Sequence, residues 1–182
     1  SLEIAGDKIF INTGSAPFIP PIKGLEATPF LTSTSIMELE ETPEHLIILG
    51  GGYIGLEFSQ MFRRFGSNVT ILDKASRLVP KEDEDVCEEI SKIFKSENIS
   101  TKLGISVTKV TFAKNQFTVF FEGKEGQEIV EGSHLLVATG RKPSSENLGL
   151  EEIGVDLTKK GHVKVNPIFE TNLRNVYALG DV

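Results

Sequence analysis

The chain has 182 residues, 39% of them hydrophobic, and a formal net charge of −7 at pH 7. This composition indicates a soluble globular protein with enough apolar residues for one good core. It argues against a nucleic-acid surface, which needs a basic stripe. It also argues against a membrane protein, because every apolar run is far shorter than the ~20 residues of a spanning helix. The only cysteine, Cys87, rules out an internal disulfide and suits a reducing cytoplasm, where we expect the protein to reside.

The first part of the chain predicts little regular structure. A short strand is expected over 8–12, and the small residues at 13–15 favour a turn, although they would also let another group approach the backbone closely. Three prolines, beginning with Pro17, predict an extended linker to about Phe30. Hydroxyl residues then precede a short helix over 36–39, which they would cap.

The chain is organised around one stretch, from His45 to Asp73. Residues 46–49 form a continuous apolar run, typical of a strand buried on both faces. The pattern Gly-x-Gly-x-x-Gly follows at 50–55, and apolar residues then recur at helical spacing until a glycine ends the helix. A second strand is expected over 68–72, and the acidic residue Asp73 follows it. Strand, glycine turn, helix, strand and acid in this order are typical of a dinucleotide-binding unit.

Beyond this stretch the pattern changes from helix to strands. A charged loop leads to a helix that Asp83 or Asp85 would cap and that runs to about Glu97. Cys87 lies on this helix without a second cysteine or a nearby histidine, which favours a structural residue over a nucleophile. An antiparallel meander is expected over 99–103, 107–113, 116–122 and 128–131, followed by strands at 134–139, 162–165 and 175–179.

The glycine turn has the residue types that bind a pyrophosphate. Gly50 makes the tight turn, Gly52 removes a side chain that would block the phosphates, and Gly55 lets the helix pack close to the strand. The helix that starts at Tyr53 directs free N–H groups and the positive end of its dipole at the same point. A purely structural glycine turn would require the strand, the helical stripe and the terminal acid to match by accident.

Asp73 lies where it can accept hydrogen bonds from the adenosine ribose hydroxyls. A 2′-phosphate about 4 Å away would feel a repulsion on the order of 4 kcal/mol per unit charge at an effective dielectric near 20. Lys74 and Arg77 could offset it through charge-assisted hydrogen bonds of about 1.5–3 kcal/mol each. NAD(H) is therefore favoured over NADP(H); the alternative is a solvated acid at a strand end.

Four motifs resemble those of the pyridine nucleotide–disulfide oxidoreductases, which are FAD-dependent enzymes, and in particular their mercuric-reductase-like branch. They are Ile-Asn-Thr-Gly-Ser at 11–15, Gly-Gly-Gly-Tyr-Ile-Gly-Leu-Glu at 50–57, Ala-Thr-Gly-Arg-Lys-Pro at 138–143 and Tyr-Ala-Leu-Gly-Asp-Val at 177–182. The motifs occur in the family's order and span nearly the whole chain.

The resemblance implies an α/β fold with a Rossmann-type parallel sheet and an antiparallel β-meander, flanked by remnants of a FAD domain that the NAD(P) domain interrupts. The implied parts are a FAD-domain-derived strand and proline-rich linker at 1–30, an NAD(P)-binding domain at 31–141 and a FAD-domain-derived return segment at 142–182.

The resemblance also implies roles for single residues. Tyr53 matches an aromatic residue that gates the nicotinamide pocket, and Glu57 an acid near the nicotinamide that can pair with a lysine of the FAD domain. Val107 matches a residue beside the adenosine, whereas its pattern alone indicates core. The predicted NAD(P) contacts are Gly50, Gly51, Gly52, Tyr53, Ile54, Gly55, Glu57, Asp73, Lys74, Val107 and Gly140, and the predicted FAD contacts in a longer protein are Thr13, Gly14, Ser15 and Asp181.

Parts that the resemblance implies are absent from the sequence: a Cys-x-x-x-x-Cys redox pair, a first FAD-binding glycine motif and a dimerisation domain. Ser1 is not a start methionine and Val182 follows an apolar strand, so we expect a piece of a longer, homodimeric enzyme. In that enzyme hydride would pass from NAD(P)H to FAD and electrons on to a disulfide and a substrate. We predict no catalytic or metal-binding residue in this chain, which alone should bind NADH in the micromolar range or more weakly and hold no FAD.

Two rival hypotheses stay open. One is a non-catalytic Rossmann module that binds a nucleotide as a signal, or nothing; it would not need the flanking motifs at 13–15 and 180–181. The other is a complete NAD-dependent dehydrogenase with a catalytic histidine. The positions of His45, His134 and His162, without an evident acid or lysine partner, disfavour it.

Overall fold

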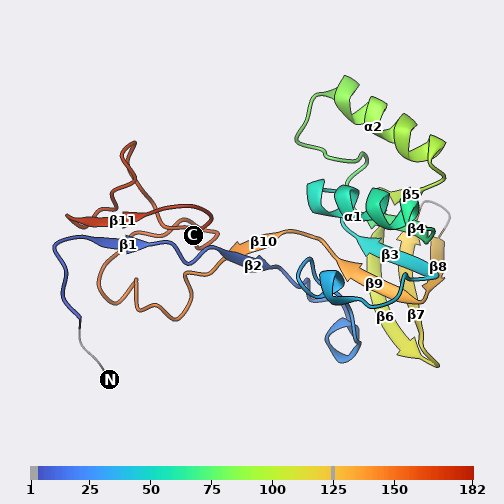
Figure 1. The fold of residues 1–182 in the computed structure, drawn as a ribbon, viewed down its shortest axis with the longest axis horizontal. Helices are drawn as coiled ribbons and strands as arrows, with labels where there is room; N and C mark the ends of the chain where they lie inside the picture. The colour runs from blue at the N-terminus through green and yellow to red at the C-terminus, as the bar shows by residue number, and fades with distance from the viewer. Residues whose placement is uncertain (1–3, 124–125) are drawn as a thin grey trace. The chain divides into compact units, whose positions relative to one another are not determined.

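The computed structural model describes residues 4–123 and 126–182, which form two compact units (Figure 1). Unit 2 comprises Pro17–Gly140, and unit 1 comprises the residues before it together with Arg141–Val182. The sequence placed the first boundary near residue 30, but the chain enters unit 2 directly after Ala16. The reason is Leu25, which is fully buried in the core of unit 2 with Ile19 and Ile22 packed nearby.

Unit 2 is built on a four-stranded parallel sheet in the order β5-β4-β3-β9. Leu46 of β3 pairs with Val69 of β4 on one side and with His134 of β9 on the other. Successive residues of β3 enter the cores on opposite faces of the sheet, which explains the unbroken apolar run. The strands are β3 (His45–Leu49), β4 (Asn68–Asp73), β5 (Ser100–Leu103) and β9 (His134–Val137).

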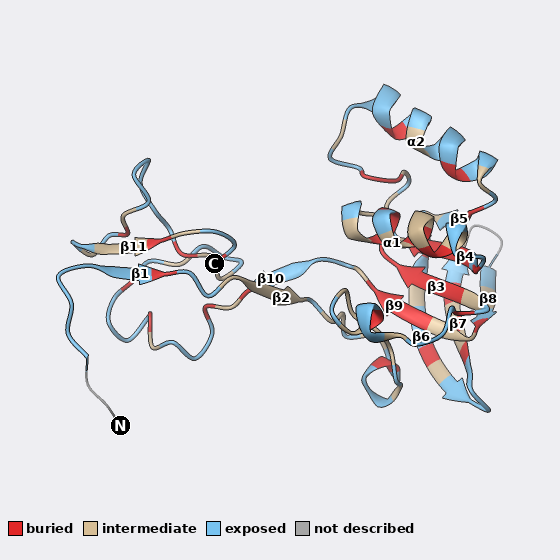
Figure 2. Cartoon of the chain, in the orientation of Figure 1, coloured by how far each residue is buried: buried red, intermediate tan, exposed pale blue. Residues whose placement is uncertain are grey.

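Two helices, α1 (Tyr53–Arg64) and α2 (Glu84–Ser96), cover one face of this sheet (Figure 1). Helix α1 ends before Gly66, whose φ of +107° stops the helix as the sequence predicted. Helix α2 buries Cys87 and Phe94 against the sheet and exposes its other side (Figure 2). Asp83 occupies the N-cap position of α2, but within the described ranges its side chain makes no capping hydrogen bond.

The antiparallel meander covers the opposite face with three strands. The segment 99–103, which the sequence assigned to this meander, instead forms β5 and pairs in parallel with β4. The meander strands pair in the order β6-β7-β8, and alternate residues of β7 are buried against the sheet: Phe117, Val119 and Phe121. Lys114 and Asn115 have positive φ angles and form the tight turn between the first two strands. The predicted glycine-bearing turn of the second hairpin includes residues 124–125, which lie outside the described residues. The bounds are β6 (Ser106–Ala113), β7 (Gln116–Gly123) and β8 (Gly126–Gly132).

Two small two-stranded sheets join segments that are distant in the sequence, and unit 1 has a modest core of its own. Strand β1 (Ile9–Ile11) pairs in parallel with β11 (Val176–Ala178), and β2 (Ser15–Pro17) pairs with β10 (Arg141–Pro143). The core of unit 1 consists of Ile11, Leu150, Val155, Val163, Ala178 and Val182.

Three other sequence predictions of secondary structure need correction. The strand expected at 162–165 is wrong, because Val163 forms only an isolated bridge with Leu157 across a turn that contains Gly161. The extended linker is interrupted by a 3-10 turn, η1 (Leu25–Ala27), and the short helix expected at 36–39 is the 3-10 helix η2 (Ser35–Glu38). None of the helices in the two described ranges is both long and apolar enough to cross a bilayer.

Candidate nucleotide-binding site

Three predicted site segments lie at the carboxyl ends of neighbouring strands. The glycine turn follows β3, Asp73 ends β4, and Gly140 comes shortly after β9. Because β4 and β9 flank β3 on opposite sides, the direction in which the chain winds reverses at β3. Open α/β sheets bind their ligands at such a switch point, outside the carboxyl ends of the strands. The topology therefore brings the glycine turn to the edge where a ligand is expected.

Two glycines of the turn are required by packing. Gly50 has φ +113°, its N–H donates to the carbonyl of Leu72 at 2.9 Å, and a side chain there would overlap the backbone of Ala138. A side chain at Gly55 would overlap the carbonyl oxygen of Gly50, where α1 crosses the turn. The close approach of strand, turn and helix thus depends on both positions.

Gly52 is different, because it faces open space. Its φ of −85° suits any residue, and no described atom lies within 4 Å of the place that a Cβ would take. The first intrahelical bond of α1 runs from the Leu56 N–H to the Gly52 carbonyl at 3.0 Å. The N–H groups before it are orphan donors, and no described side chain caps this end of the helix. A group with phosphate oxygens fits this open, electropositive helix end.

The Asp73 carboxylate is fixed against the turn. One oxygen accepts the N–H of Gly51, and the other accepts the N–H of Ala75 at 2.7 Å. A carboxylate oxygen can accept more than one hydrogen bond, so ribose hydroxyls could still bind there. Both backbone bonds are local consequences of the chain turning after β4, and they place the acid beside the predicted phosphate site.

Tyr53 and Glu57 lie one turn apart on the same side of α1, near its start. Both side chains are exposed, Tyr53 to 55%, whereas Ile54 is half-buried. The Tyr53 hydroxyl donates to the carboxylate of Glu82, and this hydrogen bond raises the pKa of the phenol.

The other predicted contacts on the adenosine side come from the segments that follow β4 and β5. Lys74 is exposed directly after Asp73, and Arg77 donates to the carbonyl of Pro80 at 3.4 Å. Val107 is half-buried in β6, close in sequence to Ile105, whose N–H donates to the Asp73 carbonyl at 3.2 Å. The start of β6 therefore lies beside the end of β4.

The residues predicted to contact FAD gather in unit 1. Ser15 donates to the Asp181 carboxylate at 3.2 Å and accepts a hydrogen bond from Arg141 Nε at 2.7 Å. The Thr13 hydroxyl donates to the carbonyl of Ser144 at 2.8 Å. Gly14, which lies between Thr13 and Ser15, has φ +67°. Asp181, which follows β11, thus forms a polar cluster with Ser15 and Arg141.

Two of the three histidines, His45 and His134, lie away from the glycine turn. His45 and His134 are the first residues of β3 and β9, so they occupy the amino ends of the sheet, opposite the edge that carries the turn. Burial lowers the pKa of both, and the His45 Nε2 atom lies 2.9 Å from the Thr70 hydroxyl. His162 lies in unit 1. The placement of His45 and His134 argues against a dehydrogenase that would use either of them beside the nicotinamide.

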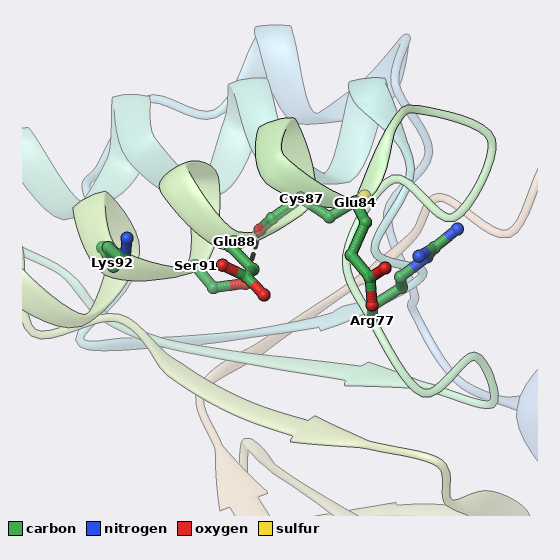
Figure 3. A pocket seen from close by; sticks show the side chains of 6 residues that line it. All are labelled: Arg77, Glu84, Cys87, Glu88, Ser91 and Lys92. Carbon is green, nitrogen blue, oxygen red and sulfur yellow. Dashed lines mark hydrogen bonds between the residues drawn. The ribbon is translucent and has the colours of Figure 1, made fainter.

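A hollow of about 280 Å³ lies beside α2, and Arg77, Glu84, Cys87, Glu88, Ser91 and Lys92 line it (Figure 3). The Cys87 residue is only 2% exposed, and its S–H lies 3.4 Å from the Val79 carbonyl. The Cys87 side chain packs beneath the loop that precedes α2 and is part of the hydrophobic core.

The sequence predicted a charged loop after Asp73 but not that this loop supports the glycine turn. Leu78 is fully buried where it would contact a side chain at Gly51, and the Val79 N–H donates to the Gly51 carbonyl at 2.9 Å. Val79 adopts φ +40°, which is unusual for a β-branched residue. No local pattern predicts such a conformation, so these supports of the turn could not be read from the sequence.

The fold and the carboxyl-edge glycine turn define a Rossmann-type α/β protein, here with a meander on one face and a second unit formed by both chain ends. The chain belongs to the pyridine nucleotide-disulphide oxidoreductase family, which it matches over residues 1–182. FAD is a cofactor of this family, and its members among the relatives below are enzymes.

Two curated relatives cover nearly all of the chain. RclA of Escherichia coli, a probable pyridine nucleotide-disulfide oxidoreductase, is 42% identical over 183 residues, which cover 100% of this chain and 41% of that protein. A mercuric reductase of Streptomyces lividans is 42% identical over 172 residues, covering 94% and 36% respectively. The chain thus spans about two fifths of the length of these relatives.

Solved structures agree with the fold. The structure of RclA, an HOCl-induced flavoprotein disulfide reductase from Escherichia coli, matches 99% of this chain with a TM-score of 0.89 at 40% identity, over 41% of its own chain. LpdA from Mycobacterium tuberculosis matches 96% with a TM-score of 0.85 at 28% identity, over 38% of its own chain. The expected fold class and family are confirmed.

Proposed function

We propose that this chain is the NAD(P)H-binding part of a flavoprotein disulfide reductase. The observation that carries the proposal is the glycine turn at the switch point of the sheet, with an open position at Gly52 and a carboxylate at Asp73. Family membership over the whole chain, including the end segments, supports it over a free-standing regulatory module. The bound nucleotide would supply a hydride for transfer to FAD.

The pyrophosphate would lie against the start of α1. There the N–H groups of Tyr53 and Ile54 have no intrahelical acceptor, and the helix dipole favours negative charge. Gly50 and Gly55 keep strand, turn and helix close enough for this arrangement, and Gly52 leaves room for the phosphates. These groups bind and orient the nucleotide.

Asp73 favours NAD(H) over NADP(H). Its carboxylate is held by two backbone N–H groups, so it cannot easily turn away from an incoming 2′-phosphate. Lys74 is the nearest cation in sequence and would offset part of the repulsion. Val107 would lie beside the adenosine, and Gly140 would let the nucleotide approach the backbone closely.

The nicotinamide half would run past Tyr53 and Glu57, which share the exposed side of α1 near the turn. In the longer protein, Glu57 would pair with a lysine of the FAD domain, and the unit 1 cluster of Thr13, Gly14, Ser15 and Asp181 would contact the flavin. Electrons would then pass to a redox disulfide outside this chain, in a cytoplasmic homodimer joined by a separate dimerisation domain.

The test uses the longer protein that carries this chain. Mixing it anaerobically with NADH should bleach the flavin absorbance, and Gly52→Ala should weaken NADH binding roughly tenfold or more, because a methyl group would displace the phosphates from N–H donors worth about 1.5–3 kcal/mol. The flavin content of the variant should equal that of the wild type. Normal reduction of Gly52→Ala at low NADH, or a flavin that neither nucleotide reduces, would overturn the proposal.

A further inference from the structure

One side chain of the loop before α2 reaches the first residue of α1. The Tyr53 hydroxyl donates to the Glu82 carboxylate, although 55% of the Tyr53 surface is exposed. A hydrogen bond to an ionised carboxylate is roughly twice as strong as one between neutral groups. The exposed Tyr53 ring, at the start of α1 beside the glycine turn, is thus held through its hydroxyl group.

Glu82 is itself anchored to the turn. Its N–H donates to the Val79 carbonyl at 2.9 Å, and the Val79 N–H donates to the Gly51 carbonyl at the same distance. The Glu82 carbonyl also lies 3.6 Å from the buried Cys87 Sγ. The carboxylate is therefore tied through two short backbone bonds to the turn whose ligand it would influence.

The ring that Glu82 holds belongs to the helix end that offers the phosphate-binding N–H groups. Side chains on a helix point back toward its N-terminus, so the Tyr53 ring lies on the ligand side of α1. Without a tether the ring would sample several rotamers and would have to be fixed when a nucleotide binds. Immobilising one side chain at an interface lowers affinity about two- to tenfold.

We propose that Glu82 is a positioning residue for nucleotide binding, which holds the Tyr53 ring by its hydroxyl before the nucleotide arrives. The inference rests on the proposed function and deepens it, because it assigns a role at the same site to a residue that would not touch the reacting atoms.

A double-mutant cycle tests the inference. NADH binding to the 182-residue chain is measured by calorimetry for the wild type, Tyr53→Phe, Glu82→Ala and the double variant. Tyr53→Phe keeps the aromatic ring and leaves the Glu82 charge in place, so it isolates the hydrogen bond. This variant should bind NADH about two- to tenfold more weakly. In the Tyr53→Phe background, Glu82→Ala should cause no further weakening. Glu88→Ala, which removes an exposed acid from α2, is the matched control and should bind as the wild type does.

A second readout needs no nucleotide. The chain has two tyrosines and no tryptophan, so Tyr177→Phe leaves Tyr53 as the only phenol that ionises in an ultraviolet titration. In that background, Glu82→Ala should move the Tyr53 pKa down toward its ordinary value, because the hydrogen bond to Glu82 raises it.

Each outcome decides the matter. Unchanged binding in Tyr53→Phe, additive losses in the double variant, or an unmoved Tyr53 titration overturns the inference and leaves the proposed function standing. Tighter binding in Glu82→Ala with no effect of Tyr53→Phe would mean that Glu82 acts by charge alone, and it also overturns the inference. If the wild-type chain binds neither NADH nor NADPH, the proposed function fails and this inference fails with it, even where the titration detects the pair.

Discussion

Gly50, Gly52 and Gly55 are glycines for different physical reasons. At Gly50 and Gly55 a side chain would overlap the backbone of Ala138 or of the turn itself, so these residues serve the fold. At Gly52 the backbone conformation suits any residue and the space is open, so packing does not require a glycine there, and we propose that the bound phosphates do. Stability and binding therefore respond separately to substitution within one motif.

Gly55→Ala and Gly52→Ala form a matched pair that tests this separation. Gly55→Ala should lower the free energy of unfolding by about 1–3 kcal/mol, because the added methyl overpacks the contact with Gly50. Gly52→Ala should change it by no more than about 0.5 kcal/mol, as for surface substitutions generally. Urea denaturation of both variants measures the difference. Equal losses of stability would show that Gly52 is also a packing residue.

Part of the site could be predicted residue by residue and part could not. The glycine pattern and Asp73 carry their chemistry in the sequence, because residue type and spacing alone suggest the phosphate and ribose contacts. The roles of Val79 and Glu82 depend on an unusual backbone angle and on a contact between a loop and α1. Tertiary packing determines both features, so local sequence patterns do not contain them.

At the scale of elements, β3 and β9 separate two kinds of chemistry. Their carboxyl ends carry the glycine turn and Gly140, whereas their amino ends carry His45 and His134. Burial disfavours the charged form of both imidazoles. The Ser133 hydroxyl links the two residues, because it hydrogen-bonds to the backbone of His45 and to the ring of His134. The amino edge of the sheet should therefore be sensitive to acid.

We expect the free energy of unfolding to fall as the pH drops below about 6.5, the ordinary histidine pKa. The folded-state pKa values of His45 and His134 are lowered, so the unfolded chain takes up protons first, and protonation then favours unfolding. Urea denaturation between about pH 7.5 and 5 measures this slope. His45→Gln with His134→Gln should reduce it, and His162→Gln controls for the loss of any histidine. An unchanged slope in the double variant would contradict the assignment.

Elements with a strong periodic pattern were predictable, and those fixed by distant contacts were not. The apolar run of β3, the helical stripe of α1 and the alternation of β7 each follow from burial against the sheet. The segment 162–165 has a similar alternation, but a turn at Gly161 limits its pairing to one bridge. Strands β2 and β10 are three residues each and pair across the length of the sequence, so local patterning cannot reveal them.

At the scale of the whole molecule, the chain is two units with separate cores, one continuous in sequence and one built from both ends. The resemblance predicts three parts along the chain, with the first boundary near residue 30, whereas the compact unit 2 begins at Pro17. That boundary depends on how Leu25 packs in three dimensions, which a proline-rich composition does not predict. The chain spans about two fifths of the length of the two curated relatives, and we propose that the electron route and the acceptor belong to a longer protein.

Calorimetric titration of the 182-residue chain with NADH and with NADPH tests the central claim most directly. We predict a colourless protein that binds NADH with a Kd in the micromolar range or weaker and binds NADPH more weakly still. Asp73→Asn should narrow that difference, because it removes the charge that repels a 2′-phosphate. Tighter binding of NADPH would contradict the role of Asp73, and a chain that binds neither nucleotide would contradict the account as a whole.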